Sequence, residues 1–150
     1  MRRTLVIAAT TMSIGTAASS ADAHHSHPYF YDSCTSLTIE GRVERVELKD
    51  PHSLILLRLD NGTLYTVDWA GLQGLTRDGW LDPAKTALVF GTRVAVTGNP
   101  IRTLTQIREH FPDYSREPNP NTIDPTLIRR VDDTWNWALK PGANPTCEPK

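Results

Sequence analysis

Four of the five histidines stand where they could bind a transition metal. His24, His25 and His27 crowd the N-terminal region, and His52 follows Pro51 in a short loop between two apolar segments. Neutral imidazole is a good ligand for Cu(II), Zn(II) and Ni(II). The pattern suggests a metal site with copper favoured. Two simpler interpretations stay open: a histidine-rich terminus can bind metal adventitiously, and His52 can simply cap its loop.

The geometry of such a site depends on where the chain is cleaved. Cleavage after Ala23 makes His24 the first residue, whose α-amine and imidazole can chelate one ion while His52 completes a T-shaped copper site. Cleavage after Ala21 instead gives a chain that starts Asp22-Ala23-His24. Its amine, two deprotonated amides and imidazole supply four nitrogens in a plane, which Cu(II) and Ni(II) favour. Both positions satisfy the small-residue rule for signal cleavage.

The two cysteines, Cys34 and Cys147, lie near opposite ends of the chain. In an oxidising compartment an isolated pair usually forms a disulfide, and neither cysteine belongs to a C-x-x-C motif. The sequence therefore predicts a Cys34–Cys147 bond, with two free thiols or a metal pair as the alternative.

Recognisable catalytic machinery is absent from the sequence. The acidic residues form no pair placed for acid–base work, and the serines lack a nucleophile-elbow motif. A glycine-rich phosphate loop and a C-x-x-C-H haem attachment site are also missing. We therefore expect a protein that is not an enzyme.

Residues 1–23 have the order of a cleavable signal peptide. The basic start Met1-Arg2-Arg3 precedes an apolar run from Leu5 to about Ile14, and small residues follow to Ala23. This run is too short to span a bilayer, and no later stretch is longer. We expect a periplasmic or secreted protein without a membrane span in its mature chain.

The charge pattern argues against nucleic acid as a partner. The whole chain carries a net charge of −1, and both signs are interspersed along it. Binding of phosphate backbones needs a concentrated basic face, which this sequence lacks.

The segment from residue 24 to residue 111 is predicted to be a small OB-like Greek-key barrel, so the fold class is mainly β. Alternating or continuous apolar residues predict strands, and Asp60-Asn61-Gly62 predicts a tight hairpin turn. The apolar phase of the first strand slips near Glu44-Arg45, which predicts a β-bulge. The expected strands are Leu37–Leu48, Ser53–Leu59, Thr63–Trp69 and Gly91–Gly98, with a fifth between Ile101 and Phe111.

Helical structure is expected in two places. Residues 71–80 predict a short crossover helix, and residues 83–88 a further helical turn. Residues 112–150 predict a proline-rich linker and then an amphipathic helix from Asp124-Pro125 to Leu139, docked on the barrel and tied back by Cys147. Its apolar stripe contains Leu127, Ile128, Val131, Trp135 and Leu139.

Four short motifs follow one another along the chain: Ala23-His24-His25-Ser26, Gly41-x-Val43, Pro51-His52-Ser53 and Gly91-x-x-Val94-x-Val96-x-Gly98-x-Pro100-x-Arg102. Their order resembles a family of exported bacterial proteins that is classed only as a domain of unknown function. The resemblance covers roughly residues 23–102. It favours cleavage after Ala23 and marks His24, His25 and His52 as candidates for a shared site. This sequence departs from the family in having Asp50 where Asn is usual, and in continuing past Arg102.

Two functions of different classes follow from these observations. The first is an exported binding protein that holds copper (or zinc or nickel) through His24, His25, His27 and His52. The second is a structural or adaptor module that binds an exported, periplasmic protein partner or a small ligand on the barrel face, using Trp69 and Trp80.

Overall fold

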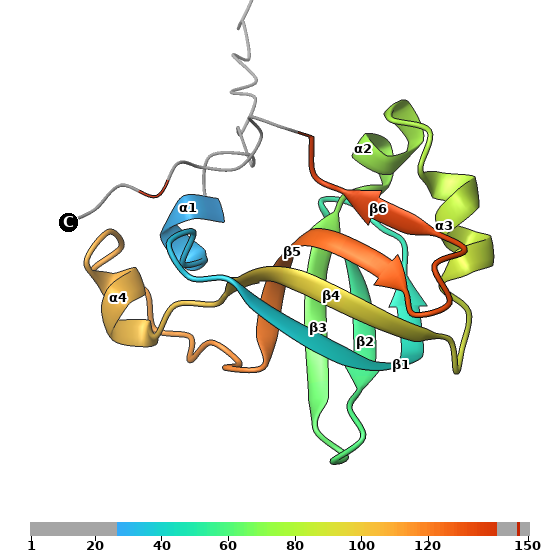
Figure 1. The fold of residues 1–150 in the computed structure, drawn as a ribbon. Coiled ribbons are helices and arrows are strands. Elements are labelled where there is room, and N and C mark those ends of the chain that lie inside the picture. Colours follow the sequence, from blue (N-terminus) through green and yellow to red (C-terminus); the bar gives the residue numbers. More distant parts are fainter. Residues whose placement is uncertain (1–26, 141–146, 148–150) are drawn as a thin grey trace, which may run out of the picture.

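The computed structural model describes residues 27–140 and residue 147, and in this part of the chain the structure is mainly β (Figure 1). The predicted signal peptide lies outside the described residues. No helix in the described part is long and apolar enough to cross a membrane. The strands are β1 (Leu37–Glu47), β2 (His52–Arg58), β3 (Leu64–Ala70), β4 (Arg93–Pro100), β5 (Thr122–Arg130) and β6 (Asn136–Ala138). The helices are α1 (His27–Phe30), α2 (Leu72–Arg77), α3 (Leu81–Ala87) and α4 (Leu104–Arg108).

The six strands form one sheet in the order β3-β2-β1-β4-β5-β6, and the neighbours in this order are antiparallel. β3 also pairs with β5 in parallel, through Thr66 with Thr122 and Val67 with Ile123. β5 is therefore paired along both of its edges.

The predicted bulge and the predicted hairpin are both confirmed. Val43 pairs with Leu57 and Arg45 with Leu56, so Glu44 is the extra residue in β1. At the β2–β3 turn Gly62 has a φ of 83°, which only glycine adopts readily. The first four predicted strands agree with β1 to β4 within a few residues, as do the two predicted helical segments with α2 and α3.

The predicted C-terminal helix from Asp124 to Leu139 is wrong, because this segment forms β5 and β6. Ile128 of the predicted apolar stripe is buried whereas Val131 is 39% exposed, so the stripe does not form one face. β5 also contains an irregularity. Ile123 and Ile128 are both fully buried, although residues five apart point to opposite faces of a regular strand. Gly98 pairs with Pro125 and Thr97 with Leu127, which leaves Thr126 as an extra residue and restores both isoleucines to one face.

The predicted fifth strand between Ile101 and Phe111 is also wrong, because α4 forms there. The Thr103 hydroxyl accepts a hydrogen bond from the Gln106 N–H, and the Gln106 side chain accepts one from the Thr103 N–H. This reciprocal cap stabilises the start of a helix. The fifth strand of the chain is instead β5, which follows residues 109–121, a segment without helix or strand.

The hydrophobic core lies between the sheet and the two helices α2 and α3. Trp69 of β3 is 1% exposed, and its ring packs edge-on against Trp137 of β6 with centroids 5.4 Å apart. Leu75, Ala84 and Leu88 extend the same core from α2 to the end of α3. Trp137 therefore serves as packing, although it does so from a strand and not from a helix.

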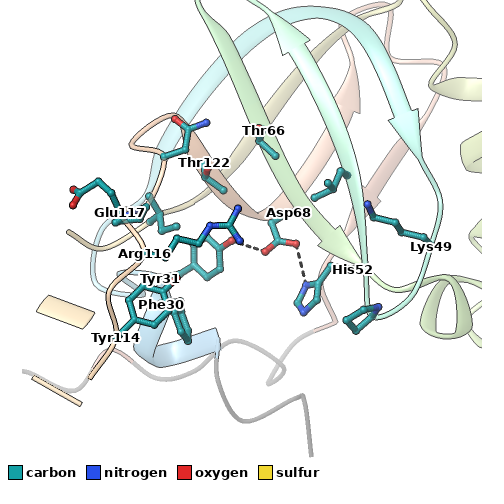
Figure 2. Close-up of a pocket in the computed structure, with 15 residues that line it drawn as sticks. Phe30, Tyr31, Lys49, His52, Thr66, Asp68, Tyr114, Arg116, Glu117 and Thr122 are labelled. Atoms are coloured by element: carbon teal, nitrogen blue, oxygen red, sulfur yellow. Dashed lines mark hydrogen bonds and ion pairs between the residues drawn. The ribbon is translucent and has the colours of Figure 1, made fainter. Parts of the chain in front are cut away.

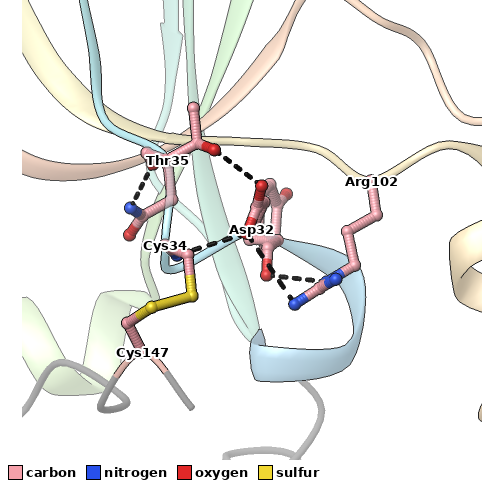
Figure 3. The surroundings of a disulfide bond; sticks show 7 residues. Asp32, Cys34, Thr35, Arg102 and Cys147 are labelled. Carbon is pink, nitrogen blue, oxygen red and sulfur yellow. Dashed lines mark hydrogen bonds and ion pairs between the residues drawn. A yellow bond between two sulfur atoms is a disulfide. The ribbon is translucent and has the colours of Figure 1, made fainter. Parts of the chain in front are cut away.

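The predicted disulfide between Cys34 and Cys147 is present (Figure 3). It joins residues 113 positions apart and fixes the end of the chain to the segment between α1 and β1. Asp32 orders this segment, since its carboxylate accepts hydrogen bonds from the Cys34 N–H at 3.2 Å and the Thr35 hydroxyl at 2.7 Å.

The strand assignment of residues 122–130 can be tested with two substitutions. Ile128→Ala should lower the free energy of unfolding by about 2–5 kcal/mol, because it leaves a cavity in the core. Val131→Ala should change it by less than about 0.5 kcal/mol, because Val131 is 39% exposed. Urea unfolding measures both values, and equal large losses would favour a helix with both residues on one buried stripe.

Removing the disulfide should destabilise the protein without abolishing the sheet. The loop-entropy model gives an upper guide of about 5 kcal/mol for a loop of this length, and strain and denatured-state structure reduce it, so Cys147→Ser should cost roughly 2–4 kcal/mol. The double variant Cys34→Ser/Cys147→Ser should lose the same amount, since both variants remove the same bond. Mass spectrometry of alkylated, non-reduced protein should find no reactive thiols in the native chain, and two alkylated cysteines would contradict the bond.

Candidate functional site

A pocket of about 580 Å³ lies on the face of β2 and β3 that points away from the core (Figure 2). Its walls come from the end of α1, the loop that precedes β2, the two strands themselves, and the segment that connects β4 to β5. Phe30 and Tyr31 line one end, while Lys49 and Pro51 belong to the loop. The β4–β5 connection and the first residue of β5 complete the lining with Ile101, Tyr114, Arg116, Glu117, Pro118, Asn119 and Thr122.

Successive side chains of β2 point to opposite faces of the sheet, and this explains why His52 faces the pocket. Ser53, Ile55 and Leu57 are buried in the core, so His52 and Leu54 lie on the opposite face. Asp68 of β3 is the cross-strand partner of Leu54, and this register places it diagonally opposite His52.

The loop before β2 is held in place by the chain that follows β3. Leu72 donates its N–H to the Lys49 carbonyl at 3.1 Å, and Gln73 donates its N–H to the Asp50 carboxylate at 3.0 Å. Gly71 permits this close approach, because a Cβ there would lie 2.8 Å from the Asp50 carboxylate oxygen. The start of α2 therefore fixes the position of His52.

His52, Asp68 and Tyr31 form a chain of contacts within the pocket. His52 Nδ1 lies 2.9 Å from Asp68 Oδ1, and the Tyr31 hydroxyl donates a 2.5 Å hydrogen bond to Asp68 Oδ2 (Figure 2). The side chains of His52 and Asp68 are 30% and 21% exposed, and Tyr31 is buried. Each carboxylate oxygen of Asp68 is therefore in contact with a neighbouring side chain. These two contacts fix the positions of His52, Asp68 and Tyr31 relative to one another.

Burial raises the pKa of the Tyr31 phenol, and the negative charge of Asp68 raises it further. The hydrogen bond to Asp68 acts in the same direction, because it stabilises the protonated phenol. Tyr31 is therefore a neutral donor at physiological pH.

The structure places one of the four candidate metal ligands. His52 lines the pocket, His24 and His25 lie outside the described residues, and His27 is the first residue of α1. Within residues 27–140, no group of three or more His, Cys, Asp or Glu side chains is arranged to hold a metal ion. The part of the predicted site that depends on the terminal histidines remains a prediction.

Sequence reasoning missed Asp68 and Tyr31. Asp68 could have been found, because the Asp60-Asn61-Gly62 turn fixes the β2–β3 register and thus its position beside His52. Tyr31 has no such signal in the sequence, since it reaches Asp68 from 37 residues away.

The tryptophans proposed for a binding face are not both suited to it. Trp69 is in the core and cannot contact a partner without unfolding of the sheet. Trp80 is partly buried and packs edge-on against Trp135, with ring centroids 6.4 Å apart. A partner surface built on Trp69 is therefore wrong.

The fold and the pocket define a small, mainly β domain with a polar and aromatic pocket. The chain belongs to a family of unknown function, DUF6152, whose model matches residues 12–107. No curated protein matches the chain. The family match includes the N-terminal histidines and His52, and it ends before β5 and β6.

The buried phenol gives the protein a specific dependence on alkaline pH. The folded pKa of Tyr31 is raised above the unfolded value of about 10, so this contribution to stability is complete below pH 10 and is lost as the pH rises further. Above pH 10 the free energy of unfolding should fall more steeply for the native chain than for Tyr31→Phe, by up to about 1.4 kcal/mol per pH unit.

Urea unfolding between pH 9 and pH 11.5 measures the difference. Tyr65→Phe is the matched control, because it removes a phenol from β3 without touching Asp68. Parallel pH curves for the native chain and Tyr31→Phe would contradict the buried neutral phenol.

Proposed function

We propose that this chain is an exported small binding protein that binds Cu(II) through its N-terminal histidines. In this proposal the signal peptide is cleaved after Ala23, and the α-amine and imidazole of His24 chelate the ion. His52 is the additional ligand, and His25 or His27 can substitute for one of the imidazoles. Zn(II) or Ni(II) are the other candidates for this set of nitrogen ligands.

One observation carries the proposal: His52 lines the same pocket as Phe30 and Tyr31, which follow the terminal histidines closely in sequence. The four residues of α1 span about 6 Å. Three further residues, as between His24 and His27, reach up to about 10 Å when extended. A terminus that begins at His24 can therefore reach the pocket that contains His52.

The topology supports a binding role for this face. We propose that the sheet closes as a small OB-like Greek-key barrel, with the parallel β3–β5 pairing joining the ends of the order β3-β2-β1-β4-β5. Barrels of this kind bind ligands on strands 2 and 3, between the loops that follow strands 1 and 4. The pocket occupies that position, since Lys49 and Pro51 come from the first of these loops and Arg116 from the second.

A second candidate function is supported by the size and composition of the pocket. A volume of about 580 Å³ is in the range of small-molecule sites, and Phe30, Tyr31 and Tyr114 offer aromatic surface. In this alternative the protein holds a small organic ligand on the barrel face, and the terminal histidines are accessory. Electron density or mass spectrometry of a ligand retained by metal-free protein would favour it.

The copper proposal is tested with protein that begins at His24. Cu(II) affinity is measured by competition with a chromophoric chelator, and electron paramagnetic resonance counts the coordinating nitrogens. One alanine added before His24 should weaken binding sharply, because it moves the amine out of the chelate ring. His52→Ala should weaken binding less, but measurably.

The fifth histidine provides the matched control. His110 follows α4 and does not line the pocket, but its ring packs against Tyr29 of α1 with centroids 4.8 Å apart. His110→Phe keeps a ring in this contact and should leave Cu(II) affinity unchanged. If the extended chain binds copper as tightly as the chain beginning at His24, the terminal chelate is wrong. If His52→Ala and His110→Phe have equal effects, His52 is not a ligand.

A further inference from the structure

The contacts of His52 suggest a role for two residues that the proposed copper site does not itself require. One carboxylate oxygen of Asp68 contacts His52 Nδ1, and the other accepts a hydrogen bond from the Tyr31 hydroxyl. All three side chains line the pocket.

We infer that Asp68 is a positioning residue that fixes the ring orientation and the tautomer of His52 for metal coordination through Nε2, and that Tyr31 holds Asp68 in place. This inference rests on the proposed copper function for its metal-binding step. The tautomer itself is a property of the metal-free protein, and it can be measured separately.

The tautomer follows from the donors and acceptors in the chain of contacts. An ionised carboxylate can only accept hydrogen bonds, so the 2.9 Å ion-pair distance between His52 Nδ1 and Asp68 Oδ1 favours a proton on Nδ1. The neutral ring then carries its lone pair on Nε2. A carboxylate behind a ligating imidazole in this way orients the ring and makes the coordinating nitrogen a stronger donor.

Tyr31 is suited to hold Asp68 because its own backbone is fixed. Its carbonyl accepts a 3.1 Å hydrogen bond from Arg102 Nε, and it forms a β-bridge with Ile101 at the end of β4. The side chain is 6% exposed, so its hydroxyl is a rigid donor. Tyr31 also directly follows α1 and therefore connects the segment of the terminal histidines to Asp68.

The first experiment measures the tautomer without metal. Protein that begins at His24 is labelled with ¹⁵N-histidine, and long-range nitrogen–proton correlation spectra are recorded at pH 8, where ordinary histidine is mostly neutral. His52, assigned by its loss in His52→Ala, should have its proton on Nδ1. In Asp68→Asn the Tyr31 hydroxyl should donate to the amide oxygen, as it does to Oδ2 of Asp68, so that the amide NH2 faces Nδ1 and the proton moves substantially to Nε2.

The second experiment measures Cu(II) affinity by the same chelator competition. Asp68→Asn should weaken binding roughly 10- to 100-fold, which is the usual effect of removing such an outer partner. Tyr31→Phe should weaken it by a smaller factor and should leave the tautomer on Nδ1, because it loosens Asp68 without replacing its carboxylate.

Matched controls come from the other end of the same hairpin. Asp60→Asn removes a carboxylate that pairs with Arg93 at 2.8 Å, and Tyr65→Phe removes a phenol from β3. Neither residue lines the pocket, so both variants should keep the native tautomer and affinity. Circular dichroism confirms that each variant is folded, and Tyr31→Phe provides the affinity test if Asp68→Asn does not fold.

The outcomes separate this inference from the copper proposal. An unchanged tautomer in Asp68→Asn overturns the role of Asp68, whatever the protein binds. A changed tautomer with native copper affinity overturns it as well, because the orientation would then not matter for coordination. If the native chain binds no copper although the Nδ1 tautomer is present, the copper proposal fails, and the metal-binding step of this inference fails with it.

Discussion

β5 has backbone partners along both edges, and the rest of the described structure depends on this arrangement. On one side it is antiparallel to β4, and on the other it begins in parallel with β3. The parallel pairing starts where Thr66 donates its N–H to the Asn121 carbonyl at 2.8 Å. Because β5 must begin beside β3, residues 101–121 have to cross the open face of β2 and β3. The pocket exists because this connection passes over polar residues of the two strands.

The side chains in the pocket are held by partners that come from separate parts of the chain. The register of β2 and β3 sets the distance between His52 and Asp68, while the end of β4 holds the backbone of Tyr31. A change in any of these elements would move one member of the group relative to the others. The site is thus a product of the sheet topology.

The sequence contains enough information for the first four strands, since their apolar patterns, the bulge at Glu44 and the Asn61-Gly62 turn are local signals. The C-terminal strands could not be predicted in the same way. Asp124-Pro125 has the form of a helix start, and the extra residue Thr126 breaks the period of two in the strand. The spacing of Leu127, Ile128 and Val131 then resembles a helix. Only the pairing with β3 and β4, which is distant in sequence, decides between the two structures.

The candidate site, like the fold, could be predicted only in part from the sequence. His52 could be selected from residue type and loop position, and Asp68 follows from the hairpin register. Tyr31 could not, because its approach to Asp68 depends on where β4 ends and on how Arg102 binds the Tyr31 carbonyl. Local patterns identify side chains capable of chemistry, whereas their partners are set by long-range topology.

The disulfide also determines what a single cut in the backbone would do. Cys34 and Cys147 enclose nearly the whole sheet and the exposed residues around Ser115 and Arg116. A protease that cleaves there produces two fragments that remain one covalent molecule, and β5 stays hydrogen-bonded to strands of the other fragment. Nicked protein would therefore migrate as a single species until a reductant is added, and the loop over the pocket could be opened without loss of the remaining sheet.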